Sequence, residues 1–299
     1  MDEIQCHTSE EQLHKKWTNG FSEDKRISNF ENTFDEWFAQ IPDKDKQTTL
    51  VLLNNLKYYS RQTVNQWLQK LHMELCSHEN VSEDNTIFAF IKSLDGKTNS
   101  SNDYWTEYKA INEINKQICF EDITSINDKQ WGYIENIVFI DDFSGSGKSF
   151  IDELQKCPDR YVGKKVFFIA VYIMAVASEK INEYAIAQNI YVTLIFAETQ
   201  GKAFESDYFE DNDAAKDQIC SMSALFHIPS REQCGYEDSQ SLIAFYNNTP
   251  NNTLGFIRYD TDEYKSIFPR RNDKKPSWQQ MDCDKGSRKK ANYNNKSGR

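Results

Sequence analysis

The sequence lacks a long hydrophobic run. No window approaches the 18 apolar residues that a membrane-spanning helix needs. The first residues, Met1-Asp-Glu-Ile-Gln-Cys6, also lack the basic and apolar regions of a secretory signal peptide. We therefore expect a cytoplasmic protein with no membrane partner. The 299 residues, 38% of them hydrophobic, provide enough apolar side chains for a sizeable core.

Cysteine and histidine do not occur in metal-binding patterns. The seven cysteines include no Cys-x-x-Cys pair and their number is odd, so the sequence indicates neither a zinc site nor a disulfide framework. We expect reduced thiols. The five histidines form no cluster, so we assign each to the surface or to packing, and the sequence supports no Ser-His-Asp triad.

Positive charge is scarce outside the C-terminus. The net charge is −11, yet residues 270–299 contain ten Lys or Arg and three Asp, so the rest of the chain carries −18. This acidic body argues against a broad nucleic-acid surface. We expect residues 271–299 to be a basic, disordered tail that either contacts phosphate groups or an acidic partner, or is only solvated.

The most informative motif is Ile137-Val-Phe-Ile-Asp-Asp-Phe-Ser-Gly-Ser-Gly-Lys-Ser149. Its apolar start predicts a buried strand of a parallel sheet, with Asp141 and Asp142 at the C-terminal end. The small residues that follow predict a loop that opens a helix, where backbone N–H groups bind phosphate. Carboxylates suit ribose hydroxyls, so the motif indicates a sugar-phosphate site, although an ordinary strand, turn and helix would have the same appearance.

A nucleotide P-loop is excluded. That motif requires glycine five positions before its Gly-Lys pair, and position 142 is Asp. The sequence Gly96-Lys97-Thr98 fails the same test, because position 91 is Ile.

Alternating patterns predict an α/β protein with a parallel sheet. We expect strands at 86–91, 165–176 and 190–196, a helix at 103–116, and helices capped by Ser28 and Ser178. The predicted divisions are a helical N-terminal region (1–85), an α/β core (86–200), a hood that completes the domain (201–270) and the basic tail (271–299).

The motif resembles the signature of type I phosphoribosyltransferases, whose required positions are filled by Asp141, Asp142, Phe143, Ser146, Gly147 and Ser149. Over about residues 25–270, the layout is similar to the phosphoribosyltransferase-like proteins of bacterial conflict systems, some encoded beside retron reverse transcriptases. The supporting motifs, Lys57-Tyr-Tyr-Ser60 and Tyr246-Asn-Asn-Thr-Pro-Asn-Asn-Thr253, are less specific.

The resemblance implies roles for three groups of residues. Asp141 and Asp142 would be catalytic, and would hold the ribose 2- and 3-hydroxyls near Mg²⁺, binding the metal through these hydroxyls or water. The residues that would hold the 5-phosphate are Ser144, Gly145, Ser146, Gly147, Lys148 and Ser149. A pyrophosphate loop would comprise Asp95, Gly96, Lys97, Thr98, Asn99, Ser100 and Ser101, although an ordinary surface loop fits that stretch nearly as well.

The resemblance also implies a function. We expect an enzyme acting on phosphoribosyl pyrophosphate or a nucleotide, as a toxic effector of a retron-type antiphage system. Its partners would be a reverse transcriptase with its nucleic acid, or another defence protein. Hypoxanthine-type relatives place an aspartate base where this chain has Gly145, which disfavours that activity. The side chains that could select a base are Tyr236, Asn247, Asn248 and Asn252, although a polar turn explains them equally.

The rival interpretation is a binding module without catalysis. The same pocket would then sense a nucleotide, or the chain would be a structural module of a nucleoprotein assembly, since a fold alone does not establish chemistry.

Overall fold

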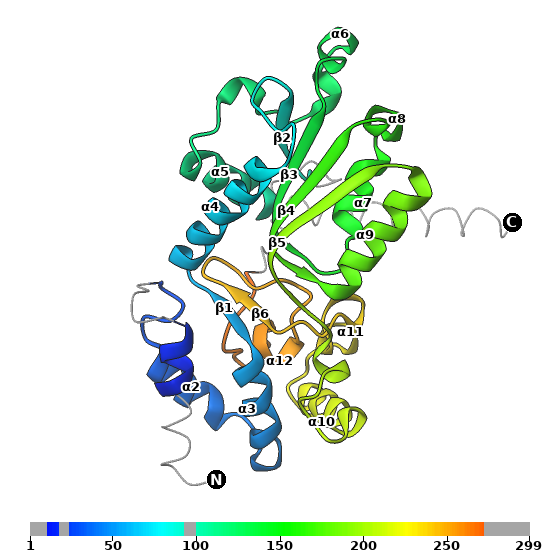
Figure 1. The fold of residues 1–299 in the computed structure, drawn as a ribbon. Helices are drawn as coiled ribbons and strands as arrows, with labels where there is room; N and C mark the ends of the chain where they lie inside the picture. The colour runs from blue at the N-terminus through cyan, green and yellow to red at the C-terminus, as the bar shows by residue number, and fades with distance from the viewer. Residues whose placement is uncertain (1–10, 18–23, 93–99, 272–299) are drawn as a thin grey trace, which may run out of the picture.

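The computed structural model describes residues 11–17, 24–92 and 100–271, which form two packed halves. One half is built around a four-stranded sheet and the other around helices from both ends of the chain (Figure 1). None of the helices in these ranges is long and apolar enough to cross a membrane.

The sheet is fully parallel, with strand order β2-β3-β4-β5, which confirms the predicted α/β class. Its central strands are apolar along nearly their whole length because helices cover both faces. Helices α4 and α5 lie on one side of the sheet, and α7 and α9 on the other (Figure 1). The strands are β2 (Thr86–Phe90), β3 (Asn136–Ser144), β4 (Lys165–Met174) and β5 (Tyr191–Gln200). The longer helices of this half are α4 (Arg61–Ser77), α5 (Ser100–Ile111), α7 (Lys148–Gln155) and α9 (Ala175–Gln188).

Three of the predicted helix starts are wrong, and the first is that of the helix expected at 103–116, which is α5 and runs from Ser100 to Ile111. Helix α2 begins at Phe30 with Asn29, not Ser28, at the N-cap. Ser178 lies inside α9, which begins at Ala175 directly after β4, because no glycine or proline separates the strand from the helix. Ser60, by contrast, caps α4 through its hydroxyl oxygen, which accepts the N–H of Thr63 at 3.1 Å.

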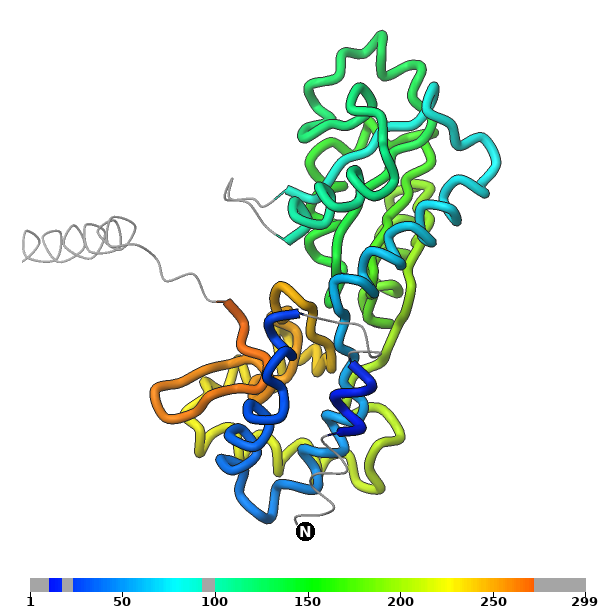
Figure 2. The backbone as a smooth tube through the Cα atoms, turned by 90° about the vertical axis from the view of Figure 1, so that its left-hand side faces the viewer, coloured from blue at the N-terminus to red at the C-terminus, as the bar shows by residue number. Residues whose placement is uncertain are grey.

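A second hydrophobic core, here called the hood core, joins residues from both ends of the chain. The predicted helical region 1–85 is therefore divided, since α2 and α3 pack in the hood core while α4 packs against the sheet. Figure 2 shows these N-terminal helices beside the last described segment of the chain, which reaches residue 271. The helices of this half are α2 (Phe30–Ala39), α3 (Lys46–Asn55), α10 (Asn212–Leu225), α11 (Ser230–Gln233) and α12 (Gly255–Arg258).

A two-stranded parallel ribbon lies between the two cores. It pairs β1 (Lys57–Tyr59) with β6 (Ile243–Phe245), and β1 is too short for sequence periodicity to have indicated it. Successive side chains of a strand point to opposite faces. Accordingly Tyr59 and Phe245 pack in the hydrophobic core around the four-stranded sheet, whereas Tyr58 packs in the hood core.

Specific polar contacts also join the two ends of the chain. The indole N–H of Trp37 donates to the Tyr264 hydroxyl at 2.6 Å inside the hood core.

The remaining short helices are η1 (Asp43–Asp45), η2 (Lys116–Ile118), η3 (Ile123–Ser125), α6 (Asp128–Trp131), α8 (Pro158–Tyr161), η4 (Ala203–Glu205) and η5 (Tyr236–Asp238).

Candidate functional site

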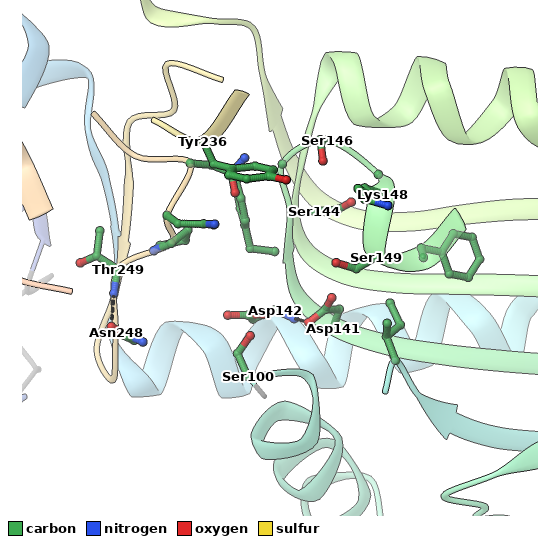
Figure 3. A pocket seen from close by; sticks show the side chains of 18 of the residues that line it. Ser100, Asp141, Asp142, Ser144, Ser146, Lys148, Ser149, Tyr236, Asn248 and Thr249 are labelled. Carbon is green, nitrogen blue, oxygen red and sulfur yellow. Dashed lines mark hydrogen bonds between the residues drawn. The ribbon is translucent and has the colours of Figure 1, made fainter. Parts of the chain in front are cut away.

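A cavity of about 810 Å³ opens at the C-terminal end of β3, between the sheet and the hood (Figure 3). Ligands of parallel α/β sheets bind at this edge. The sheet side contributes residues 141–150, together with Ser100 from α5, and the hood contributes Tyr236 and residues 247–252.

The acidic pair forms the floor of the cavity. Strand β3 continues to Ser144, so Asp141 and Asp142 belong to the strand rather than to the loop after it. Both are nearly buried, with 7% and 8% of their surface exposed. The Asp141 carboxylate accepts the backbone N–H of Asp142 at 2.9 Å, which fixes its orientation.

Burial and mutual repulsion change the protonation of these two acids. Burial, followed by the neighbouring Asp142 charge, raises the pKa of Asp141 well above its usual range. Burial also raises the pKa of Asp142, opposed by hydrogen bonds from Asp141 and from the hydroxyl of Ser100. Burial and repulsion therefore make the pair hold a proton more readily than free aspartates do, and a ligand or cation that stabilises both charges would oppose this.

The loop after the acids leads directly into α7. Gly147 is the N-cap and has φ +76°, a left-handed conformation that other residues adopt only with strain. Because glycine supplies no capping side chain, the first N–H groups of α7 remain free of a side-chain cap. All six residues predicted to hold phosphate line the cavity, from Ser144 to Ser149.

The side chain of Lys148 forms an ion pair within α7 and does not point freely into the cavity as a phosphate-binding lysine would. Its ammonium group contacts both carboxylate oxygens of Asp152, one turn later on α7, at 2.9 and 2.8 Å. This ion pair raises the pKa of Lys148. The lysine lies at the cavity wall, but Asp152 already partly neutralises its charge.

The predicted pyrophosphate loop falls largely outside the described residues, which do not include Asp95, Gly96, Lys97, Thr98 and Asn99. Ser100 begins α5, three residues before the predicted start, and lines the cavity. Ser101 is buried and does not line the cavity. Its hydroxyl donates to Ile140 O at 2.7 Å and accepts from Ile91 N–H at 3.0 Å, so it links β2, β3 and α5.

The hood places all four side chains considered for base recognition at the cavity: Tyr236, Asn247, Asn248 and Asn252. Asn247 accepts from the Tyr104 hydroxyl at 3.1 Å. Figure 3 shows the Tyr236 ring on the hood side, reaching toward the loop that carries Ser144. The side-chain amide nitrogen of Asn252 is buried without a hydrogen-bond partner.

Asn252 also packs directly on the phosphate loop. A methyl group placed on Gly145 would lie 2.2 Å from the Asn252 amide nitrogen. Glycine is therefore required at 145 for the hood to approach the loop this closely. The close approach of Asn252 accounts for the glycine at position 145, where hypoxanthine-type relatives have their aspartate general base.

Two cationic residues at the cavity were not identified from the sequence as site residues. Arg270 donates to Thr249 O at 2.8 Å, and Arg271 donates its backbone N–H to Asn248 at 2.9 Å. Burial, and then the Arg258 charge, lowers the pKa of Arg270, whereas Asp142 has the opposite effect. The available signal is the Arg270-Arg271 pair directly after the apolar Ile267-Phe-Pro, although local composition assigns position 271 to the basic tail.

The donor set at the acidic pair fits a magnesium ion. Mg²⁺ prefers carboxylate and water oxygens and usually takes only one or two carboxylates from a protein. Asp141 and Asp142 supply two, and neither takes part in any ion pair in the described part of the chain. No cluster of three or more acidic, histidine or cysteine ligands occurs among the described residues, so a ligand and water would complete the coordination.

Comparison with known proteins identifies the family. A family model described as PRTase-CE matches residues 34–270, which include the four-stranded sheet, most of the hood core and every described lining residue of the cavity except Arg271. No curated protein matches the chain. The match covers well over half of the 299 residues and confirms the resemblance indicated by the Asp141–Ser149 motif. The chain therefore belongs to the PRTase-CE family, phosphoribosyltransferase-like proteins of bacterial conflict systems.

Proposed function

We propose that the cavity binds a phosphoribosyl compound, either phosphoribosyl pyrophosphate or a nucleotide, and that the chain transfers or hydrolyses its phosphoribosyl group. The observation that carries this proposal is the convergence of Asp141 and Asp142, the loop from Ser144 to Gly147 and the start of α7 on one cavity. Carboxylates suit the ribose hydroxyls, while helix N–H groups suit the 5-phosphate.

The chain's own residues would act by positioning and by electrostatics. The ribose hydroxyls would donate to Asp141 and Asp142, whose negative charge stabilises the positive charge that develops on the ribose ring. A magnesium ion bound there would offset the charge of a leaving pyrophosphate. Arg270 and Arg271 are further cations at the same cavity, suited to a second phosphate group.

The hood would exclude water and recognise the base. Tyr236 is 42% exposed and can stack on a base without losing a buried contact. The asparagines of residues 247–252 offer amide donors and acceptors at the same wall. These features support a nucleotide or nucleobase next to the sugar.

As a biological role, we propose that the protein is a toxic effector of a retron-type antiphage system. Its proposed partners are a reverse transcriptase with its nucleic acid, or another defence protein. The match to a family of conflict-system proteins supports this role. Expression with and without the genomic neighbours tests it, because an effector stops growth when its partner is removed and a housekeeping enzyme does not.

One observation favours the alternative, a nucleotide sensor without catalysis. Gly145, against which Asn252 packs, stands where hypoxanthine-type relatives have their aspartate general base, and none of the described histidines lines the cavity. Asp152 is already paired with Lys148. A sensor would bind the same ligands but release no product.

Calorimetry tests the binding site. We expect phosphoribosyl pyrophosphate to bind in the presence of Mg²⁺, and Asp141→Asn with Asp142→Asn to weaken binding at least about 100-fold, since two charge-assisted contacts are lost. The matched control is Glu179→Gln with Glu183→Gln, two exposed carboxylates on α9. Equal affinities in the acid-pair variant and the wild type would show that the site assignment is wrong.

A turnover assay separates the enzyme from the sensor. We expect release of pyrophosphate, base or sugar phosphate by the wild type, and loss of release in Ser146→Ala and Asp142→Asn. A protein that binds phosphoribosyl pyrophosphate but releases nothing, even with its genomic partners, is the sensor.

A further inference from the structure

Two cysteines of the hood lie in direct contact. Cys220 belongs to α10, and Cys234 follows α11 immediately. Their sulfur atoms are 3.3 Å apart. A disulfide joins its sulfurs at about 2.0 Å, so a movement on the order of one ångström would bring these two to bonding distance.

The two thiols differ in acidity and exposure. The hydrogen bond from Cys234 lowers the pKa of Cys220 to about 7, against the effect of burial and helped by the Lys216 charge one turn earlier on α10. The same hydrogen bond, with burial, raises the pKa of Cys234. Cys220 is half-buried and Cys234 is buried. Cys220 therefore has the properties of an attacking thiolate and Cys234 those of a second, resolving thiol.

The other described cysteines lack this arrangement. Cys76 contacts His72, Cys119 donates to the backbone oxygen of Asn115, and Cys157 contacts the Tyr161 hydroxyl. Burial raises the pKa of each of these three thiols. They are thus natural internal controls for the reactive pair.

We propose that Cys220 and Cys234 form a redox site that a peroxide oxidises reversibly to a disulfide. The Cys220 thiolate attacks one peroxide oxygen, the O–O bond breaks, and the departing hydroxide takes up a proton to become water. The Cys234 thiol then loses its proton, its sulfur attacks the sulfenic acid of Cys220, and the S–O bond breaks to release a second water. The two thiols lose two electrons in total, and hydrogen peroxide gains them.

The oxidised pair would lie directly behind the cavity wall. The backbone oxygen of Cys234 accepts from Gln240 N–H at 2.9 Å, and the next residue, Gly235, packs on the backbone of Asn252. Tyr236 follows and lines the cavity. The redox chemistry itself is independent of the ligand that the cavity binds.

Peptide mapping of the full chain tests the proposal. Arg231 lies between the two cysteines, so trypsin separates them into peptides 217–231 and 232–258. After treatment with a slight excess of hydrogen peroxide, we expect these two peptides to be linked, and dithiothreitol to release them. At pH 7 we expect iodoacetamide to alkylate Cys220 at least about tenfold faster than Cys157, because only Cys220 is substantially ionised there.

Substitutions define the roles of the two thiols. Cys234→Ser should abolish the link and leave Cys220 as a sulfenic acid that dimedone traps, whereas Cys76→Ser should link as the wild type does. If Cys234→Ser does not fold, Cys220→Ser serves instead, and its Cys234 should resist dimedone. The proposal is overturned if folded wild-type protein gives no 220–234 link, or if peroxide oxidises Cys76 or Cys157 first.

Discussion

The two walls of the cavity come from very different parts of the sequence. The sheet wall is nearly continuous, because Asp141 to Ser149 runs from a strand through a loop into a helix. The hood wall is assembled from Tyr236, residues 247–252 and the Arg270-Arg271 pair. A local segment forms the sheet wall, with its acidic pair and helix start, whereas long-range packing assembles the hood wall opposite to it.

Arg26 is the clearest link in the hood wall. Its guanidinium donates to Phe245 O at 2.6 Å, to the Thr249 hydroxyl at 2.8 Å and to Pro269 O at 2.7 Å. One N-terminal side chain therefore joins the end of β6, the asparagine-rich turn and the segment that leads to Arg270.

The largest expected effect comes from removing this link. Arg26→Ala should lower the free energy of unfolding by about 2–4 kcal/mol, because three acceptors lose a charged donor. Hydrogen exchange should increase around residues 245–249 and at the amides of residues 268 and 270, and much less in β3. Arg61→Ala is the control: this arginine is 64% exposed and pairs with Glu107, so its loss should cost less than about 1 kcal/mol. Equal losses in both variants would contradict the assigned role of Arg26.

The same contrast explains what the sequence could predict. The Asp141–Ser149 motif fits within one strand, one loop and one helix start, so residue types and spacing indicated it directly. The four strands of the sheet were also predictable, since buried parallel strands are continuous apolar runs. Tyr236 and Asn252 of the hood wall were also candidates, because each lies in a polar segment rich in glycine or asparagine.

Contacts between distant segments were not predictable. The pairing of β1 with β6 joins three-residue strands about 186 positions apart, Lys57 with Ile243, and periodicity has no meaning over three residues. Arg271 was assigned to the basic tail because local composition changes there, whereas the structure holds it against Asn248. The sulfur contact between Cys220 and Cys234 depends on how α10 and α11 pack, which no cysteine spacing rule describes.

The two walls of the cavity meet at Gly145 and Asn252. Substitutions there should have an intermediate effect on the free energy of unfolding. Gly145→Ala should lower the free energy of unfolding by about 1–2 kcal/mol, because its methyl group overlaps the Asn252 side chain. In an Asn252→Ala background the same change should cost little, so the two substitutions should be strongly non-additive. Denaturant unfolding of the four proteins measures this coupling.

A glycine elsewhere provides the control for this coupling. Gly201 is exposed, with its nearest atom 4.0 Å from where a methyl group would lie. Gly201→Ala should therefore be nearly neutral, in either background. Additive effects at 145 and 252 would mean that the hood does not close on the loop in solution.

The smallest expected effect concerns the protonation of the acidic pair on the sheet wall. Burial raises the pKa of Asp141 above that of an unfolded aspartate, which is about 3.9. The folded state thus holds a proton that the unfolded state releases, so wild-type stability falls as pH rises from about 4 to the folded pKa and is then constant.

Asp141→Asn has no carboxyl to titrate at this position, so it does not lose stability in this way. As the pH rises above about 4, its free energy of unfolding should therefore gain on that of the wild type, and the gain should level off once the pH passes the folded pKa of Asp141. Urea titrations at several pH values measure the difference, with Glu179→Gln on the exposed face of α9 as the control that should show no such trend. A difference between Asp141→Asn and the wild type that does not change with pH would mean that the pair is fully ionised in the free protein, and that the sheet wall binds its ligand without first releasing a proton.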